Sequence, residues 1–387
     1  MDYEKNEMSN SDDSTMGRKK PTAETKGTVS TCVATFEIHH TQFLDHDAKV
    51  KGSLPEFARD PANLISLYRA MVLTRLFDKK AVALQRTGQL GTYSPALGQE
   101  ATFVAVGSAM RPEDVLLPTY RESGAMFLHG VSMQELLLYW GGDERGMDYA
   151  VAREDFPICI PIATHAPQAA GVALAMKLRR EPRVAVCTLG DGATSKGDFY
   201  EAINLAGAWQ LPVVFVVCNN QWAISLPRSE QTRAQTLAQK AIAAGIDGEQ
   251  VDGNDVIAVH HRLALALEKA RVGGGPTLIE ALSYRMGDHT TADDASRYRT
   301  QEELEEQWRL DPIKRLHDFL VKNGDWTEQK EQALNAECTQ EVEQAVKDYL
   351  ATPPPPPESM FDYLYEKLPT SLASQREAAI RRGAKHA

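Results

Sequence analysis

Two short polar motifs, each at the end of an apolar run, constrain the fold of this chain more than any other feature. Gly190-Asp191-Gly192 follows the run 184–189, and Asn219-Asn220 ends the run that starts at residue 212. Between the motifs, apolar residues recur at helical spacing from Asp198 to Trp209, which predicts a strand, a helix and a second, parallel strand. The two motifs then lie at the carboxyl ends of neighbouring strands, where open α/β sheets bind their ligands.

The same alternation of strands and helices extends over roughly residues 100–285. Periodicity and end signals predict helices at Pro61–Thr87, Gln99–Met110, from Ser132 onward, Pro167–Leu178 and Asp255–Arg271, and a further strand at Thr277–Leu282. Ser132 with Glu135, and Thr300 with Glu303, predict capping boxes at two helix starts. The predicted fold class is therefore α/β, with a doubly wound, mostly parallel sheet and helices on both faces.

The two ends of the chain differ from its middle in composition. Residues 1–30 are polar and show no periodicity, which predicts a disordered tail, and Met16 is an alternative start. We expect the α/β domain to cover residues 31–350. Residues 351–387 are predicted to form a proline spacer and a helical extension that contacts a partner through the apolar-aromatic patch Met360–Tyr365. The other interpretation of this patch is a tail folded back on its own domain.

Charge and cysteine usage exclude several classes of protein. The formal net charge of −11 argues against a general nucleic-acid binder, which needs clustered Lys and Arg. The five cysteines show no Cys-x-x-Cys spacing and are interpreted as core thiols in a reducing compartment. No apolar run is long enough to span a bilayer. We therefore expect a cytoplasmic protein whose partners include neither nucleic acid nor a membrane.

Several polar residues near the predicted strand ends are suited to binding a diphosphate. Asp191 and Asn220 offer a carboxylate and an amide oxygen, the hard ligands that suit Mg²⁺, and the glycines beside Asp191 let the backbone approach phosphate oxygens. Tyr120-Arg121 follows an apolar run and adds a hydroxyl and a guanidinium. His289, in a loop after the strand Thr277–Leu282, is suited to donate to a phosphate or to shuttle protons. Taken singly, these residues have simpler interpretations: a turn, a surface ion pair and a solvated histidine.

Taken together, the two motifs and their spacing resemble the thiamin diphosphate-binding motif of the thiamin-dependent enzymes. From about Phe36 to Pro369 the chain resembles the alpha subunit of the decarboxylating first component of 2-oxo acid dehydrogenase complexes, of the bacterial pyruvate dehydrogenase type. Further landmarks in the same order are Leu90-Gly91-Thr92-Tyr93, Gly98-Gln99-Glu100-Ala101, Tyr120-Arg121, Pro161-Ile162-Ala163-Thr164, Pro167-Gln168-Ala169-Ala170-Gly171 and Tyr298-Arg299-Thr300.

The resemblance implies a role for each matching residue. Asp191, Asn220 and the backbone carbonyl of Trp222 are expected to hold Mg²⁺. The residues expected to bind thiamin diphosphate are Tyr120, Arg121, Ile162, Gly190, Asp191, Gly192, Ala193, Asn220 and His289. Within this set Ile162 packs under the cofactor, and His289 is the catalytic residue on the route to the acyl acceptor. Some members of the family have a potassium site at the segment of Pro161 and Thr164, but here the chain departs from the pattern, because His165 stands where an amide is common, and this leaves the site open. Thr290 stands where some animal relatives carry a regulated phosphoserine.

The function implied is the oxidative decarboxylation of pyruvate by an alpha subunit of pyruvate dehydrogenase, with transfer of the acetyl group to the lipoyl group of an acyltransferase component. The same resemblance implies a beta subunit and an α2β2 heterotetramer. The sequence also indicates a partner by itself, because one diphosphate half-site fits in the chain and no second α/β unit remains for the other half of the cofactor. The alternatives are a branched-chain 2-oxo acid dehydrogenase alpha subunit and a non-catalytic scaffold or regulatory subunit that retains the fold. A dinucleotide-binding oxidoreductase is disfavoured because no Gly-x-Gly-x-x-Gly opens a helix after a strand.

Overall fold

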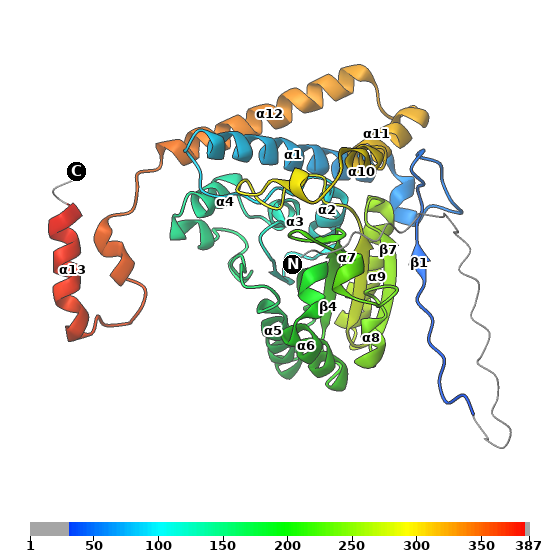
Figure 1. Ribbon diagram of the computed structural model, residues 1–387, viewed down its shortest axis with the longest axis horizontal. Coiled ribbons are helices and arrows are strands. Elements are labelled where there is room, and N and C mark those ends of the chain that lie inside the picture. Colours follow the sequence, from blue (N-terminus) through cyan, green and yellow to red (C-terminus); the bar gives the residue numbers. More distant parts are fainter. Residues whose placement is uncertain (1–30, 384–387) are drawn as a thin grey trace, which may run out of the picture. The chain divides into compact units, whose positions relative to one another are not determined.

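The computed structural model describes residues 31–383 (Figure 1). The chain divides into two units, residues 1–37 and 38–387. Of the first unit, only residues 31–37 are described; they are exposed and have no regular secondary structure, and the predicted tail 1–30 lies outside the described residues. The predicted border between the α/β domain and the C-terminal segment, between residues 350 and 351, stays a prediction. In the described part of the chain, no helix is both long and apolar enough to cross a membrane.

A sheet of six parallel strands forms the centre of residues 38–383, in the order β1-β7-β8-β4-β3-β2. Its strands are β1 (His40–Thr41), β2 (Val115–Leu117), β3 (Ala185–Gly190), β4 (Val213–Asn219), β7 (Asp247–Asp252) and β8 (Thr277–Leu282). A short antiparallel hairpin, β5 (Trp222–Ala223) and β6 (Leu226–Pro227), follows β4. The inner strands β3 and β4 are apolar along almost their whole length because helices cover both faces of the sheet. The predicted doubly wound, parallel α/β fold is confirmed.

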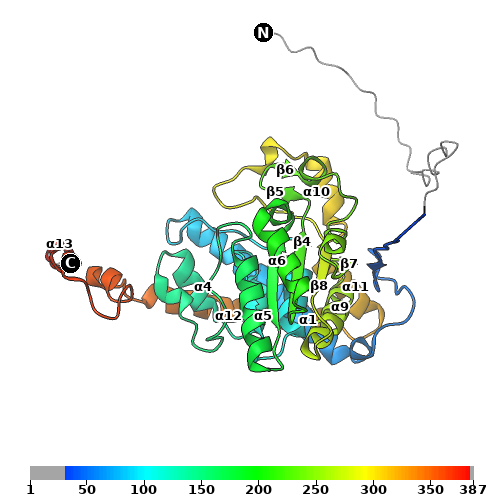
Figure 2. The same cartoon turned by 90° about the horizontal axis from the view of Figure 1, so that it is seen from below.

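Two apolar cores lie on opposite faces of this sheet, and successive residues of a strand alternate between them: Val186 belongs to one core, Cys187 and Leu189 to the other. The helices on the Cys187 side are α5 (His165–Arg179) and α6 (Gly197–Ala208), which lie side by side in Figure 2, and the short α8 (Lys240–Ala243). The Val186 side packs against α1 (Pro61–Arg86), α2 (Glu100–Ala109), α3 (Ser123–Leu128), α4 (Met133–Trp140), α9 (Val256–Arg271), α11 (Pro312–Lys322) and α12 (Glu328–Ala351).

The direction of the crossovers explains this division and locates the ligand-binding edge. The order β2, β3, β4 advances across the sheet in one direction, whereas β7 to β8 advances in the other. Because parallel crossovers are right-handed, α5 and α6 cover one face and α9 the other. The two runs meet between β4 and β8, and the carboxyl ends of strands at such a switch point are where α/β sheets bind ligands.

Most predicted element boundaries agree with the structure to within two residues. Pro61 opens α1 behind the capping residue Asp60, and Pro167 lies in the first turn of α5. The capping box of Ser132 and Glu135 is confirmed at α4. At α10 (Gln301–Trp308) the predicted box is wrong in one half: Thr300 accepts from the backbone N–H of Glu303, but the Glu303 carboxylate accepts from the Tyr284 hydroxyl at 2.5 Å.

The C-terminal part of the chain is helical, as predicted. The long helix α12 attaches to the core through Leu334, Cys338, Val342 and Val346, which recur every four residues on an otherwise charged surface. After the proline spacer come a 3₁₀ turn, η5 (Pro357–Phe361), and α13 (Thr370–Gly383), neither of which contains a buried residue. The short elements not named so far are η1 (Glu56–Arg59), η2 (Glu144–Met147), η3 (Asp191–Ser195), α7 (Arg228–Gln231) and η4 (Ala295–Arg297).

Candidate active site

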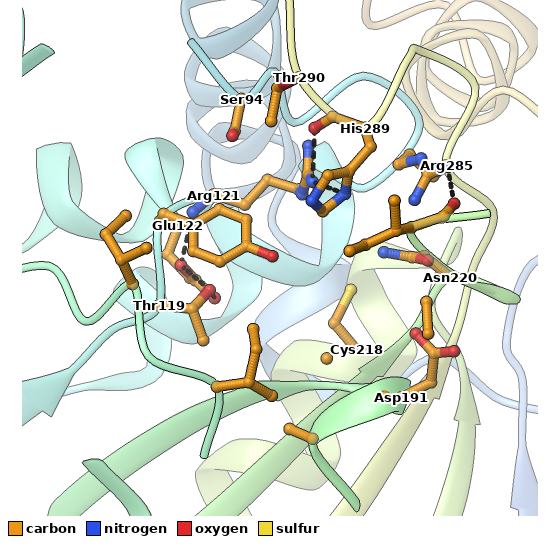
Figure 3. Close-up of a pocket in the computed structure, with 18 of the residues that line it drawn as sticks. Ser94, Thr119, Arg121, Glu122, Asp191, Cys218, Asn220, Arg285, His289 and Thr290 are labelled. Carbon is orange, nitrogen blue, oxygen red and sulfur yellow. Dashed lines mark hydrogen bonds between the residues drawn. The ribbon is translucent and has the colours of Figure 1, made fainter. Parts of the chain in front are cut away.

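A cavity of about 700 Å³ lies at the carboxyl ends of β2, β3, β4 and β8 (Figure 3). Strand register produces it, because Gly190 of β3 pairs with Cys218 of β4 and Asn219 of β4 pairs with Leu282 of β8, so that the turns after these strands face one another. The cavity is lined by every predicted site residue: Tyr120, Arg121, Ile162, Gly190, Asp191, Gly192, Ala193, Asn220, Trp222 and His289. The structure therefore brings the whole predicted set together.

Asp191 opens the 3₁₀ turn η3 directly after β3 and is 1% exposed. Burial raises the pKa of this carboxyl to about 6, against hydrogen bonds from Gln231 Nε2, at 3.2 Å from Oδ2, and from the backbone, including the Gly192 N–H. A carboxylate that has been taken out of water and receives few donors is a strong ligand for a cation.

The other oxygen donors stand at the end of β4. Asn220 Oδ1 accepts from the backbone N–H of Trp222 at 3.2 Å, and the carbonyl of Trp222 accepts from Arg285 Nη1 at 3.2 Å. Residues 31–383 contain no group of three or more His, Cys, Asp or Glu side chains that would hold a metal. A cation here would therefore depend on one carboxylate supplemented by amide and backbone oxygens, a hard donor set that fits Mg²⁺.

The opposite wall of the cavity is cationic. Arg121 is 6% exposed; its Nη1 donates to the Pro95 carbonyl at 2.6 Å and its Nη2 to the carbonyl of His289 at 2.9 Å. Arg285 is 1% exposed and donates to Trp222, to the carbonyl of Ile224 at 2.7 Å and to the Tyr298 hydroxyl at 2.8 Å. Within the described residues neither guanidinium has a carboxylate partner. Two buried cations without a carboxylate at ion-pair distance favour an anionic ligand such as a diphosphate.

His289 lies against Arg121, with its Nδ1 at 3.2 Å from Arg121 Nη2 and its ring edge-on to that of Tyr120. Arginine has only donors, so Nδ1 is the accepting nitrogen and the proton of the neutral ring is on Nε2. Burial, followed by the nearby Arg121 and Arg285, lowers the pKa of His289 to about 4. At neutral pH the imidazole is therefore an uncharged donor through Nε2.

The loop that carries His289 is held at two points. Asp293 Oδ2 accepts from the His289 backbone N–H at 2.8 Å and from the Tyr298 hydroxyl at 2.5 Å. Beyond the cavity, Thr291 N donates to the Tyr93 carbonyl at 2.8 Å, and Tyr93 N donates to Thr291 Oγ1 at 3.0 Å. Thr290 lies between these anchors and borders the cavity.

The surroundings of the two glycines of the first motif, Gly190 and Gly192, differ. A Cβ at Gly190 would meet no atom within 4 Å, so this glycine leaves open space on the cavity side. A Cβ at Gly192 would lie 2.9 Å from Cβ of Ala223, so this glycine lets the β5–β6 hairpin approach the turn. His165, at the predicted potassium segment, is buried and its Nε2 contacts the carbonyl of Thr188 at 2.6 Å.

Among the residues in or beside the cavity that the sequence does not predict for the site, Gln99, Gln231 and Arg285 contact Asn220, Asp191 and Trp222, respectively. A Tyr-Arg pair follows both β2 (Tyr120-Arg121) and β8 (Tyr284-Arg285). This repeated pattern is the sequence feature that identifies Arg285 as a candidate site residue. Gln99 stands in the landmark 98–101, which carried no assigned role. Gln231 reaches Asp191 from α7, and nothing in the sequence indicates that contact.

Comparison with known proteins agrees with the geometry of the cavity. Residues 68–358 match the dehydrogenase E1 component family. Over 345 residues, the chain is 41% identical to proteins named pyruvate dehydrogenase E1 component subunit alpha from Staphylococcus aureus strain Mu50 and from Staphylococcus epidermidis. These alignments cover 88% of this chain and 92% of each relative. The chain therefore belongs to the dehydrogenase E1 component family, the 2-oxo acid dehydrogenases that use thiamin diphosphate.

Proposed function

We propose that this chain is the alpha subunit of a cytoplasmic pyruvate dehydrogenase E1 component. With a beta subunit it decarboxylates pyruvate and passes the acetyl group to the lipoyl group of an acyltransferase component. The observation that carries the proposal is that one cavity holds the buried carboxylate of Asp191 together with the guanidinium groups of Arg121 and Arg285, neither of which has an ion-pair partner among residues 31–383. The name shared by relatives that align with most of the chain supports the choice of pyruvate.

In this proposal the oxygen donors hold the metal. Asp191, Asn220 and the carbonyl of Trp222 would bind Mg²⁺, and the metal would neutralise part of the diphosphate charge. The fit is chemical: among residues 31–383, Asp191 has no ion pair, and the amide oxygen of Asn220 accepts only from a backbone N–H at 3.2 Å. Hard oxygen ligands in a small, water-poor turn are the donors that Mg²⁺ prefers.

The cationic wall would bind the diphosphate oxygens. Arg121 and Tyr120 offer side-chain donors, and the turn at Gly192 and Ala193 would offer backbone donors once the Asp191 carboxylate, which accepts from the Gly192 N–H, is engaged by the metal. Ile162, 41% exposed at the rim, would pack under the cofactor rings. When bound, thiamin diphosphate supplies the nucleophilic carbon and the electron-accepting ring needed for loss of CO₂, so the chain itself provides placement and charge.

His289 contributes a hydrogen-bond donor near the bound diphosphate. Its neutral ring presents the Nε2 proton because Nδ1 is engaged by Arg121. A diphosphate in the cavity would bring negative charge close to this ring. That charge favours the protonated form of His289 and so counteracts the lowering of its pKa by Arg121 and Arg285. We propose that the neutral ring of His289 donates a hydrogen bond through Nε2 to a phosphate oxygen, that the ring protonated beside the diphosphate transfers a proton to the incoming acyl acceptor and returns to the neutral form, and that His289 is the catalytic residue of this chain.

The beta subunit would complete the site from the rim of the cavity. Ile160, Ile162 and Ile224 line the cavity and are 48%, 41% and 56% exposed. Apolar side chains left in water around a ligand cavity indicate a protein partner. The half-site in this chain binds the diphosphate end of the cofactor, and the other end needs a second subunit.

Calorimetric titration tests this proposal. Thiamin diphosphate with Mg²⁺ is titrated into the chain alone and into the chain mixed with the beta subunit. Tight binding is expected only with the beta subunit, and Asp191→Ala is expected to abolish it. The control Asp198→Ala, a partly exposed aspartate just beyond the turn, should leave binding unchanged. No binding to the parent complex would refute the proposal and favour the scaffold alternative.

Substrate choice is tested with the same complex. Pyruvate and a branched-chain 2-oxo acid are compared with a lipoyl acceptor, and kcat/KM is expected to be clearly higher for pyruvate. Equal values for the two acids would contradict the assignment to pyruvate while leaving the thiamin-dependent reaction intact.

A further inference from the structure

The side chain of Asn220 can serve a cation only in one of its two orientations. An amide presents a carbonyl oxygen on one side and an NH₂ group on the other, and only the oxygen binds a metal. In the structure Nδ2 of Asn220 donates to Oε1 of Gln99 at 2.8 Å, which leaves Oδ1 as the available atom. Two contacts therefore favour the orientation in which Asn220 can be a ligand: the acceptor at Nδ2, at 2.8 Å, and the longer hydrogen bond that Oδ1 accepts from the backbone N–H of Trp222, at 3.2 Å.

Gln99 is itself held in this orientation. Its Oε1 also accepts from the thiol of Cys218 at 3.3 Å, so turning the Gln99 amide over would place an NH₂ group against the Asn220 NH₂. The residue is fully buried where the backbone enters α2, and it borders the cavity. No other polar side chain of the described residues accepts from Asn220 Nδ2.

This arrangement is maintained at a cost. In residues 31–383, Gln99 Nε2 is a buried donor without a hydrogen-bond partner. Such a group is unfavourable by about 1–3 kcal/mol, and native proteins contain few of them. A methionine or leucine would fill the same space without an unsatisfied donor. The Gln99 oxygen, which accepts from both Asn220 and Cys218, is thus the part of this amide that is engaged in the described residues.

We propose that Gln99 is a positioning residue that fixes the amide oxygen of Asn220 as a metal ligand. The proposal rests on the proposed function, since it requires that Asn220 binds Mg²⁺. It adds a residue that acts through the orientation of a metal ligand and is not itself a ligand. Its effect must therefore disappear when the ligand side chain offers oxygen in both orientations.

A double-mutant cycle tests this directly. Mg²⁺ is titrated calorimetrically into the alpha-beta complex at saturating thiamin diphosphate. Gln99→Met, which keeps the length of the side chain but removes the acceptor, is expected to weaken Mg²⁺ binding roughly tenfold, the value of one lost orienting hydrogen bond of about 1.4 kcal/mol. Asn220→Asp has an oxygen on both sides, so in that background Gln99→Met is expected to change the affinity less than about twofold.

A matched control separates orientation from packing. Thr102→Val removes another buried hydrogen bond on α2, from Thr102 Oγ1 to the Gly253 carbonyl at 3.1 Å, and is expected to leave Mg²⁺ affinity unchanged. If Gln99→Met does not assemble, Gln99→Glu provides the test. It keeps an oxygen facing Asn220, so its Mg²⁺ affinity should equal or exceed that of the parent, and a tenfold fall would overturn the inference.

The two possible failures are distinguishable. If Gln99→Met lowers Mg²⁺ affinity equally in the parent, which has Asn220, and in the Asn220→Asp variant, Gln99 does not act through Asn220. The same conclusion holds if Gln99→Met leaves the Mg²⁺ affinity of the parent unchanged. Absence of Mg²⁺-dependent binding in the parent complex would instead refute the proposed function.

Discussion

At the scale of single residues, the loop that supports the cavity depends on one buried carboxyl. Asp78 accepts from the Tyr93 hydroxyl at 2.5 Å and from the Ala96 backbone N–H at 2.6 Å. Burial raises the pKa of Asp78 to about 7, with Glu100 also raising it and Arg121 and the Tyr93 hydrogen bond lowering it. The folded chain is therefore most stable when the Asp78 carboxyl is protonated and neutral.

The sign of the resulting pH dependence follows from linkage. The unfolded chain ionises Asp78 near its ordinary value of 3.8, and the folded chain does so near 7. The stabilising contribution is complete below about pH 4 and is lost as the pH rises to about 7, by at most about 1.4 kcal/mol per pH unit. Asp78→Asn should remove this slope. Urea unfolding at several pH values between 4.5 and 8 checks it, and parallel curves for parent and variant would contradict it.

Residue-level prediction from the sequence succeeded where chain neighbours define the geometry. Asp191 and Asn220 were identifiable because each directly follows an apolar strand, and parallel strands end at a common edge. Gln99 and Gln231 were not, because their contacts with Asn220 and Asp191 join segments far apart in the chain. Such contacts depend on the packing of α2 and α7 against strand ends, which periodicity does not encode.

At the scale of elements, one side chain of β8 ties the strands to the helices around the site. Glu280 is fully buried; its Oε1 accepts from Asn219 Nδ2 at 2.6 Å, and its Oε2 accepts from the backbone N–H groups of Leu237 and Ala238 at 2.8 and 3.1 Å. Gln250 Nε2 adds a donor at 3.1 Å. The end of β4, the segment before α8 and the neighbouring strand β7 thus share one acceptor.

Glu280→Gln is expected to destabilise the chain, because an amide NH₂ must then face one group of these donors. The loss of unfolding free energy should be about 1–3 kcal/mol, the usual effect of leaving buried donors unsatisfied. Urea denaturation measures it. Thr277→Val, at the start of the same strand, loses only the hydrogen bond from Lys269 Nζ and serves as the control. A variant as stable as the parent would mean that Glu280 does not hold these elements together.

The sequence predicts best those helices and strands whose apolar residues recur most regularly. β3, α6, β4, α9 and β8 have strong apolar patterns and lie where the sequence placed them. The hairpin β5–β6 was not foreseen, since each strand has two residues and owes its shape to left-handed backbone at Gln221 and Ile224. The reciprocal cap of α10 failed because the Glu303 carboxylate is engaged by Tyr284, a competitor visible only in the fold.

At the scale of the whole molecule, the segment after α12 has surface that the described chain does not cover. Met360, Tyr363, Leu364 and Tyr365 are 61%, 90%, 66% and 54% exposed. Residues 352–383 contain no fully buried side chain. Burial of such side chains contributes roughly 1.5–3 kcal/mol each when a partner covers them. We therefore expect this segment to contribute to binding of the beta subunit.

Ending the chain after Thr352 is expected to leave the α/β fold intact and to weaken assembly with the beta subunit. The core residues of α12 end at Val346, so the truncation removes none of them. Circular dichroism and urea unfolding of the truncated chain check the fold, and light scattering after size-exclusion chromatography measures the mass of its complex with the beta subunit. In the full-length chain, the double substitution Tyr363→Ser and Leu364→Ser should reproduce the assembly defect, because it removes apolar surface without shortening the chain. Normal assembly of both variants would assign the contact to the exposed isoleucines at the cavity rim instead.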